Sequence, residues 1–116
     1  MKPTVLALTD LRESFQNDAD ILSSILDMFL IEVPQDYLIL KNCIENKDFK
    51  AARLQAHKVK SSYKTLGIDD MASILQEIED CTRTETDLNT IPELLSKFNE
   101  KYEHINAQVL YTREQL

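Results

Sequence analysis

One histidine lies among basic residues in the stretch AHKVKSSYKTLG, which begins at Ala56. If this stretch is helical, the rotation of roughly 100° per residue turns His57 away from the apolar residues and toward solvent. Side chains at spacings of three, four and seven residues share its helical face. These residues are Lys50, Arg53, Leu54, Lys60, Ser61 and Lys64. Four of them are cations and none is an acid. The sequence therefore predicts an exposed imidazole on a basic surface.

This basic surface belongs to a chain whose formal net charge is -7. The segment 47–64 contains six cations and one acid, so it carries +5 and the remaining residues carry -12. Like charges one turn apart on a helix repel by about a few tenths of a kcal/mol per pair. A helix that is merely solvated tends to mix the two signs, so this pattern indicates a site for an anion or an acidic partner.

The chemistry that suits such a site is phosphoryl transfer. A neutral imidazole offers a lone pair that can attack phosphorus, and neighbouring cations favour that neutral form. A phosphoryl group on the ring adds about two negative charges, which the same cations then attract. Lys60 lies one helical turn from His57, near enough for its ammonium to reach a phosphoryl oxygen, and Ser61 is small enough to leave the ring accessible. We therefore expect His57 to carry the phosphoryl group, with Lys60 and Ser61 stabilising it.

Helices must position this face, because apolar residues recur along most of the chain at intervals of three or four. A short first helix is expected from Thr9 or Asp10 to Phe15. A second is expected to begin near Asp18 and to end near residue 44, with a kink or a junction between two helices at Pro34.

Three further helices are expected, each with its own start or stop signal. The third follows Asp48, whose side chain can cap it, and ends before Gly67. The fourth covers about residues 69–81. The fifth starts at Thr90, where the sequence Thr-Ile-Pro-Glu matches a capping box, and continues to about residue 109.

The fold class follows from these segments and from the composition. One glycine and three prolines in 116 residues leave too little turn chemistry for a sheet protein of this size. We predict an all-α fold, an antiparallel four-helix bundle with a short additional N-terminal helix, in one domain covering 1–116. Because each apolar stripe is used inside one bundle, we expect a monomer.

Several classes of protein are disfavoured. No segment approaches the roughly 20 apolar residues of a membrane span, and no signal peptide is recognisable, so we expect a cytoplasmic protein without membrane insertion. The negative charge argues against nucleic-acid binding. Cys43 and Cys81 lack the paired spacing of zinc or redox sites, which indicates small core residues in a reducing compartment.

The stretch His57-Lys58-Val59-Lys60-Ser61-Ser62, followed by Leu66-Gly67, is similar to the central pattern of the histidine-containing phosphotransfer (HPt) family, roughly His-x-Leu-Lys-Gly-Ser and then Leu-Gly. The similarity covers about residues 5–105. Further matching positions are Leu11, Phe15, Met28-Phe29-Leu30, Asp48 and Ile78-Glu79. Two positions depart from the pattern: Val59 replaces a more usual leucine, and Ser61 replaces a glycine. The hydroxyl of Ser61 can bond either a phosphoryl group or the preceding helical turn.

The resemblance implies a phosphorelay carrier in two-component signalling. His57 would accept a phosphoryl group from an aspartate of a receiver domain, in a response regulator or a hybrid sensor kinase, and pass it to another receiver. The resemblance implies no cofactor in this chain, since the Mg²⁺ belongs to the receiver, and no nucleotide binding or kinase activity. Receiver active sites are acidic, which suits a docking face formed by Lys50, Arg53, Leu54, Lys58 and Lys64.

Other functions stay open at this point. The chain could be an interaction bundle in which His57 is an ordinary surface residue. A helical metal protein is a weaker alternative, because the single pair Glu100 and His104 lies off the apolar seam of the last helix. A hydrolase is disfavoured because no acid on the helical face of His57 could orient its ring. Whether the chain is free-standing or part of a hybrid kinase, and which receivers it serves, is not indicated.

Overall fold

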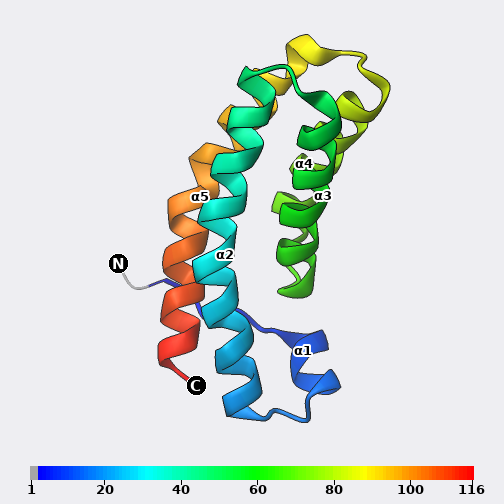
Figure 1. Cartoon of the computed structure of the whole chain (residues 1–116). Helices are drawn as coiled ribbons and strands as arrows, with labels where there is room; N and C mark the ends of the chain where they lie inside the picture. The colour runs from blue at the N-terminus through cyan, green and yellow to red at the C-terminus, as the bar shows by residue number, and fades with distance from the viewer. Residues whose placement is uncertain (1–2) are drawn as a thin grey trace.

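The computed structural model describes residues 3–116, and this range contains five α-helices and no strand. Figure 1 shows their arrangement. The elements are α1 (Thr9–Ser14), α2 (Ala19–Glu45), α3 (Phe49–Thr65), α4 (Asp69–Thr84), the 3₁₀ turn η1 (Leu88–Thr90) and α5 (Ile91–Glu114). The predicted all-α bundle with a short additional N-terminal helix is confirmed.

The helices α2 to α5 form the bundle, and α1 lies near one end of it (Figure 1). The long helices α2 and α5 run side by side, and the shorter α3 and α4 form a hairpin that packs on them. Aromatic rings connect three of these helices in the core. Tyr63 of α3 meets Phe29 of α2 edge-on at 5.1 Å and Phe98 of α5 edge-on at 5.6 Å between ring centroids. This packing fixes the inner face of α3 and so determines which of its residues face outward.

The helix α2 continues through Pro34 without a break. Of the two alternatives predicted at Pro34, the junction between two helices is therefore wrong, and the kink stays a prediction. A proline inside a helix removes one backbone hydrogen bond, but Phe29, Val33 and Tyr37, on either side of it, are buried in the core. Tertiary packing of this apolar face keeps α2 as one helix.

The ends of α3 follow the predicted signals. The side chain of Asp48 accepts a hydrogen bond from the backbone N–H of Ala51 at 3.3 Å, which caps the start. At the other end Gly67 has a φ of 72°, a left-handed conformation that glycine adopts without strain. The N–H of Ile68 then donates to the carbonyl of Tyr63 at 3.0 Å, which closes the helix and redirects the chain into α4.

The capping box predicted at Thr90 does not form. Residues 88–90 make a 3₁₀ turn that leads directly into α5, and Thr90 itself has a helical conformation. Its hydroxyl donates backward to the carbonyl of Asp87 at 2.7 Å and makes no side-chain cap for α5. The 3₁₀ turn extends the helical conformation ahead of α5, which leaves Thr90 without the extended backbone that a capping residue needs.

Cys43 and Cys81 are free thiols, partly buried and packed against the core. Among the helices of residues 3–116, none is both long enough and apolar enough to cross a membrane.

Candidate functional site

His57 lies on the outer face of α3, and its side chain is 62% exposed. Its neighbour Ala56 and the nearby Val59 are completely buried. The rotation of the helix therefore separates the imidazole from the core residues beside it. The predicted solvent-facing position of the ring is confirmed.

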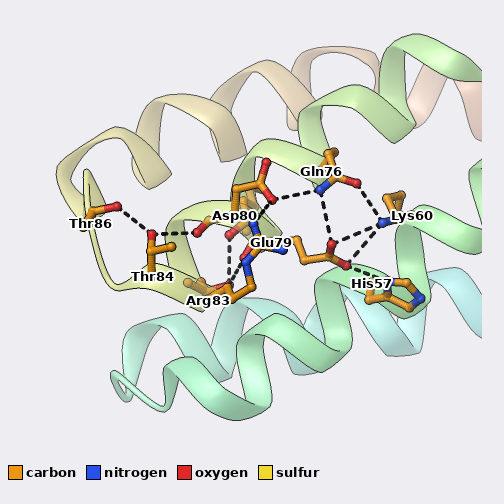
Figure 2. Close-up of polar contacts among 10 residues, drawn as sticks. His57, Lys60, Gln76, Glu79, Asp80, Arg83, Thr84 and Thr86 are labelled. Carbon is orange, nitrogen blue, oxygen red and sulfur yellow. Dashed lines mark hydrogen bonds and ion pairs between the residues drawn. The ribbon is translucent and has the colours of Figure 1, made fainter.

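The imidazole has an acidic partner on a different helix. The Nδ1 atom of His57 lies 2.6 Å from Oε1 of Glu79, which is on α4 (Figure 2). An ionised carboxylate can only accept a hydrogen bond, so a neutral ring must carry its proton on Nδ1 to make this contact. The lone pair of the neutral ring is then on Nε2, for which the described residues provide no hydrogen-bond partner. The arrangement orients an unprotonated nitrogen for nucleophilic attack.

No expectation from the sequence assigned this role to Glu79. The absence of an acid was inferred from the helical face of His57 alone, whereas the acid comes from the helix packed beside it. The sequence did contain a signal for a buried acid, because Glu79 lies on the inward face of α4 together with Ala72, Leu75 and Thr82. A glutamate is rarely buried without a charged partner. Its position in the buried stripe could therefore have indicated a cation or a histidine facing α4.

Lys60 is buried, with 6% of its surface exposed, so the expectation that it shares the exposed face of His57 is wrong. Its ammonium lies 2.8 Å from Oε1 of Gln76 and 3.2 Å from Oε2 of Glu79 (Figure 2). The residue falls at the edge of the α3 face that packs against α4, and its long side chain reaches into that interface. The stabilisation of a phosphoryl group by Lys60 stays a prediction; in this structure the ammonium holds Glu79.

The charge state of Glu79 follows from these contacts. Burial alone would raise its pKa, but the hydrogen bonds from His57 and Lys60, together with their charges, outweigh burial and lower the pKa below its ordinary value. Glu79 is therefore ionised at neutral pH. It can hold the Nδ1 proton of His57 and offset positive charge that develops on the ring.

The five residues predicted to form the docking face lie on the outer side of α3. Lys50, Leu54, Lys58 and Lys64 are exposed, and Arg53 is partly buried. Lys58 is not free, because its ammonium lies 3.1 Å from Oδ1 of Asp36 on α2.

Ser61 is exposed, and its hydroxyl donates to the carbonyl of His57 at 3.0 Å. Two hydrogen-bond partners were expected for this hydroxyl, a phosphoryl group or the preceding helical turn, and the observed bond is to the preceding turn. A contact from Ser61 to a phosphoryl group stays a prediction and requires a rotation of this side chain.

Glu100 and His104, the pair considered for a metal, are both exposed on α5. Within residues 3–116 no group of three or more His, Cys, Asp or Glu side chains is placed to hold a metal ion.

The lowered pKa of Glu79 predicts how stability depends on pH. The unfolded chain binds this proton more readily than the folded one, so the stabilisation is complete above about pH 4.5 and is lost as the pH falls through the lower, folded-state pKa. We expect Glu79→Gln to cost about 2 kcal/mol of unfolding free energy near pH 5.5 and less near pH 3. Urea unfolding at these pH values measures the difference.

Glu77→Gln, at an exposed position of the same helix, is the matched control for this measurement. Equal losses from Glu79→Gln at both pH values would contradict an ionised, hydrogen-bonded Glu79.

The family model of the Hpt domain matches residues 24–108 of the chain, a range that includes His57, Lys60 and Glu79. Comparisons with curated proteins and with solved structures gave no match. The matched residues cover most of the chain and all or part of α2, α3, α4 and α5. The exposed imidazole that contacts Glu79 lies near the middle of the matched region. The chain therefore belongs to the Hpt domain family, the helical phosphocarriers of two-component signalling.

Proposed function

We propose that His57 accepts a phosphoryl group from the aspartyl phosphate of one receiver domain and passes it to the aspartate of another. The observation that supports this most directly is the exposed ring whose Nδ1 is held by Glu79 at 2.6 Å. It leaves Nε2 as the nitrogen with an available lone pair and with access to solvent. The family supports histidine phosphotransfer in general; the residue and its partners are our proposal.

The transfer is a displacement at phosphorus. Nε2 of His57 attacks, the bond between phosphorus and the receiver's carboxylate oxygen breaks, and the carboxylate leaves with the electron pair. The N–P bond that forms places positive charge on the imidazole, and the nearby carboxylate of Glu79 offsets this charge. Return of the phosphoryl group to a second receiver is the same displacement in reverse. The chain supplies orientation and electrostatics, and the Mg²⁺ and the acidic pocket belong to the receiver.

The docking face for receivers in this proposal is the outer side of α3. Lys50, Arg53 and Lys64 share the helical face of His57 and give it positive charge, and the exposed Leu54 adds an apolar contact. Lys58 is exposed beside this face, but its ammonium is paired with Asp36 and must leave that partner to contact a receiver. Complementary charge speeds the encounter with an acidic partner and sets its orientation. Because Lys60 is buried, it is not part of this surface.

Incubation of the full chain with a phosphorylated receiver tests the proposed function. We expect the chain to acquire a label that is labile in acid and stable in alkali, as a phosphohistidine is, and to transfer it to a second, unlabelled receiver. A chain that binds receivers but acquires no label would be an interaction bundle, and the carrier function would be wrong.

A further inference from the structure

A hollow of about 250 Å³ adjoins His57 on the outer side of the α3–α4 hairpin. Its lining consists of Arg53, Leu54, His57, Glu79 and Arg83. One guanidinium comes from α3 and the other from α4, and both share this space with the imidazole. The hollow is several times the roughly 30 Å³ that one water molecule takes in the liquid, so it has room for a tetrahedral anion beside the ring.

The two arginines are available to an anion, whereas Lys60 is not. Arg53 has no hydrogen-bond acceptor or ion-pair partner among residues 3–116. Arg83 contacts Asp80 at 3.0 Å, in a pair whose side chains are 56% and 47% exposed (Figure 2). Exposed pairs of this kind contribute about 0–1 kcal/mol and exchange easily for a stronger partner. The ammonium of Lys60 is held in the helix interface by Gln76 and Glu79.

Guanidinium groups are well suited to a phosphoryl group. Each presents several N–H donors in one plane and can bind two oxygens at once, and it stays charged at every physiological pH. A phosphoryl group on Nε2 carries about two negative charges, which two arginines can balance. Glu79, the acid in the same hollow, is already paired with His57 and Lys60.

We propose that Arg53 and Arg83 hold the oxygens of the phosphoryl group on His57, and that Lys60 instead positions Glu79. This inference rests on the proposed function of His57 as the carrier. In the transfer described above, the two guanidinium groups meet the phosphoryl oxygens from the adjoining hollow, and Arg83 exchanges Asp80 for one of these oxygens. The bound phosphoryl group is thereby stabilised without burial, and a receiver can still remove it.

Potassium phosphoramidate, a small phosphoryl donor, tests the inference without any receiver. The full chain is phosphorylated on His57, and the pH midpoint of the ³¹P resonance of the phosphoryl group is measured. Nearby cations favour the dianion and lower this midpoint. We expect the midpoint to rise by about one pH unit in Arg53→Gln/Arg83→Gln, and by about half as much in each single variant. Glu79, Lys60 and Asp80, the other charged groups near the ring, are unchanged in these variants.

The control is Lys47→Gln, which removes one exposed cation of the same basic segment at a position that does not line the hollow. This control is expected to leave the midpoint unchanged. Arg83→Lys, which keeps the positive charge, is expected to raise the midpoint less than Arg83→Gln does. An unchanged midpoint in the double variant, or an equal shift in Lys47→Gln, would overturn the inference. Failure of phosphoramidate to label His57 would overturn it too, because the hollow would not admit the group. Failure of receivers to label a chain that phosphoramidate labels would reject the proposed function alone.

Discussion

Replacement of His57 with glutamine is expected to abolish uptake of the phosphoryl label from a receiver. Glutamine keeps a polar side chain of similar length on the surface of α3, but its amide nitrogen has no lone pair available for attack on phosphorus. Because the native side chain is 62% exposed, the substitution should leave the bundle intact. The label on both proteins is measured after incubation with the same phosphorylated receiver, and circular dichroism checks the fold.

His104→Gln is the matched control, since His104 is the only other histidine of the chain and is exposed on α5. It is expected to acquire as much label as the wild type. Equal labelling of His57→Gln and the wild type would show that another residue carries the phosphoryl group.

Replacement of Glu79 with alanine is expected to slow phosphorylation of His57 by about 100-fold or more. The carboxylate fixes the Nδ1 proton and offsets the charge that forms on the ring, and removal of one such preorganised electrostatic partner costs about 10²–10³-fold in rate. Single-turnover kinetics with a phosphorylated receiver measure the rate. The ¹⁵N chemical shifts of the imidazole report separately whether the proton still prefers Nδ1.

Two variants separate this role from a loss of stability. Glu79→Gln is expected to keep part of the rate, because its amide oxygen can still accept the Nδ1–H. Glu77→Ala removes an exposed acid of α4 and is expected to leave the rate unchanged. A folded Glu79→Ala protein with the wild-type rate and the wild-type ¹⁵N shifts would reject the positioning role.

The sequence was sufficient to predict the bundle and the exposure of the histidine. Both depend on the positions of apolar residues along single helices, such as Ala56 and Val59 beside His57, and helical rotation converts these positions directly into faces. The end of α3 was equally predictable, because Gly67 adopts a left-handed conformation that costs glycine no strain.

The contacts between helices could not be predicted from the sequence in the same way. A wheel drawn for α3 alone placed Lys60 beside His57, but the packing of α4 buries this lysine and brings Glu79 to the imidazole. The relative rotation of two helices depends on how their whole surfaces fit together. Pro34 shows the same limit, since the packing of α2 against the core overrides the local preference of proline.

Every group assigned here to the reaction lies in α3 or α4, two consecutive helices joined by the short turn at Gly67. His57 and Glu79 are only 22 positions apart along the chain. The reactive centre is thus self-contained within one hairpin, and the two long helices serve as its support. Their outer surfaces can accumulate substitutions while the nucleophile, the acid beside it and the docking face on α3 keep the same geometry.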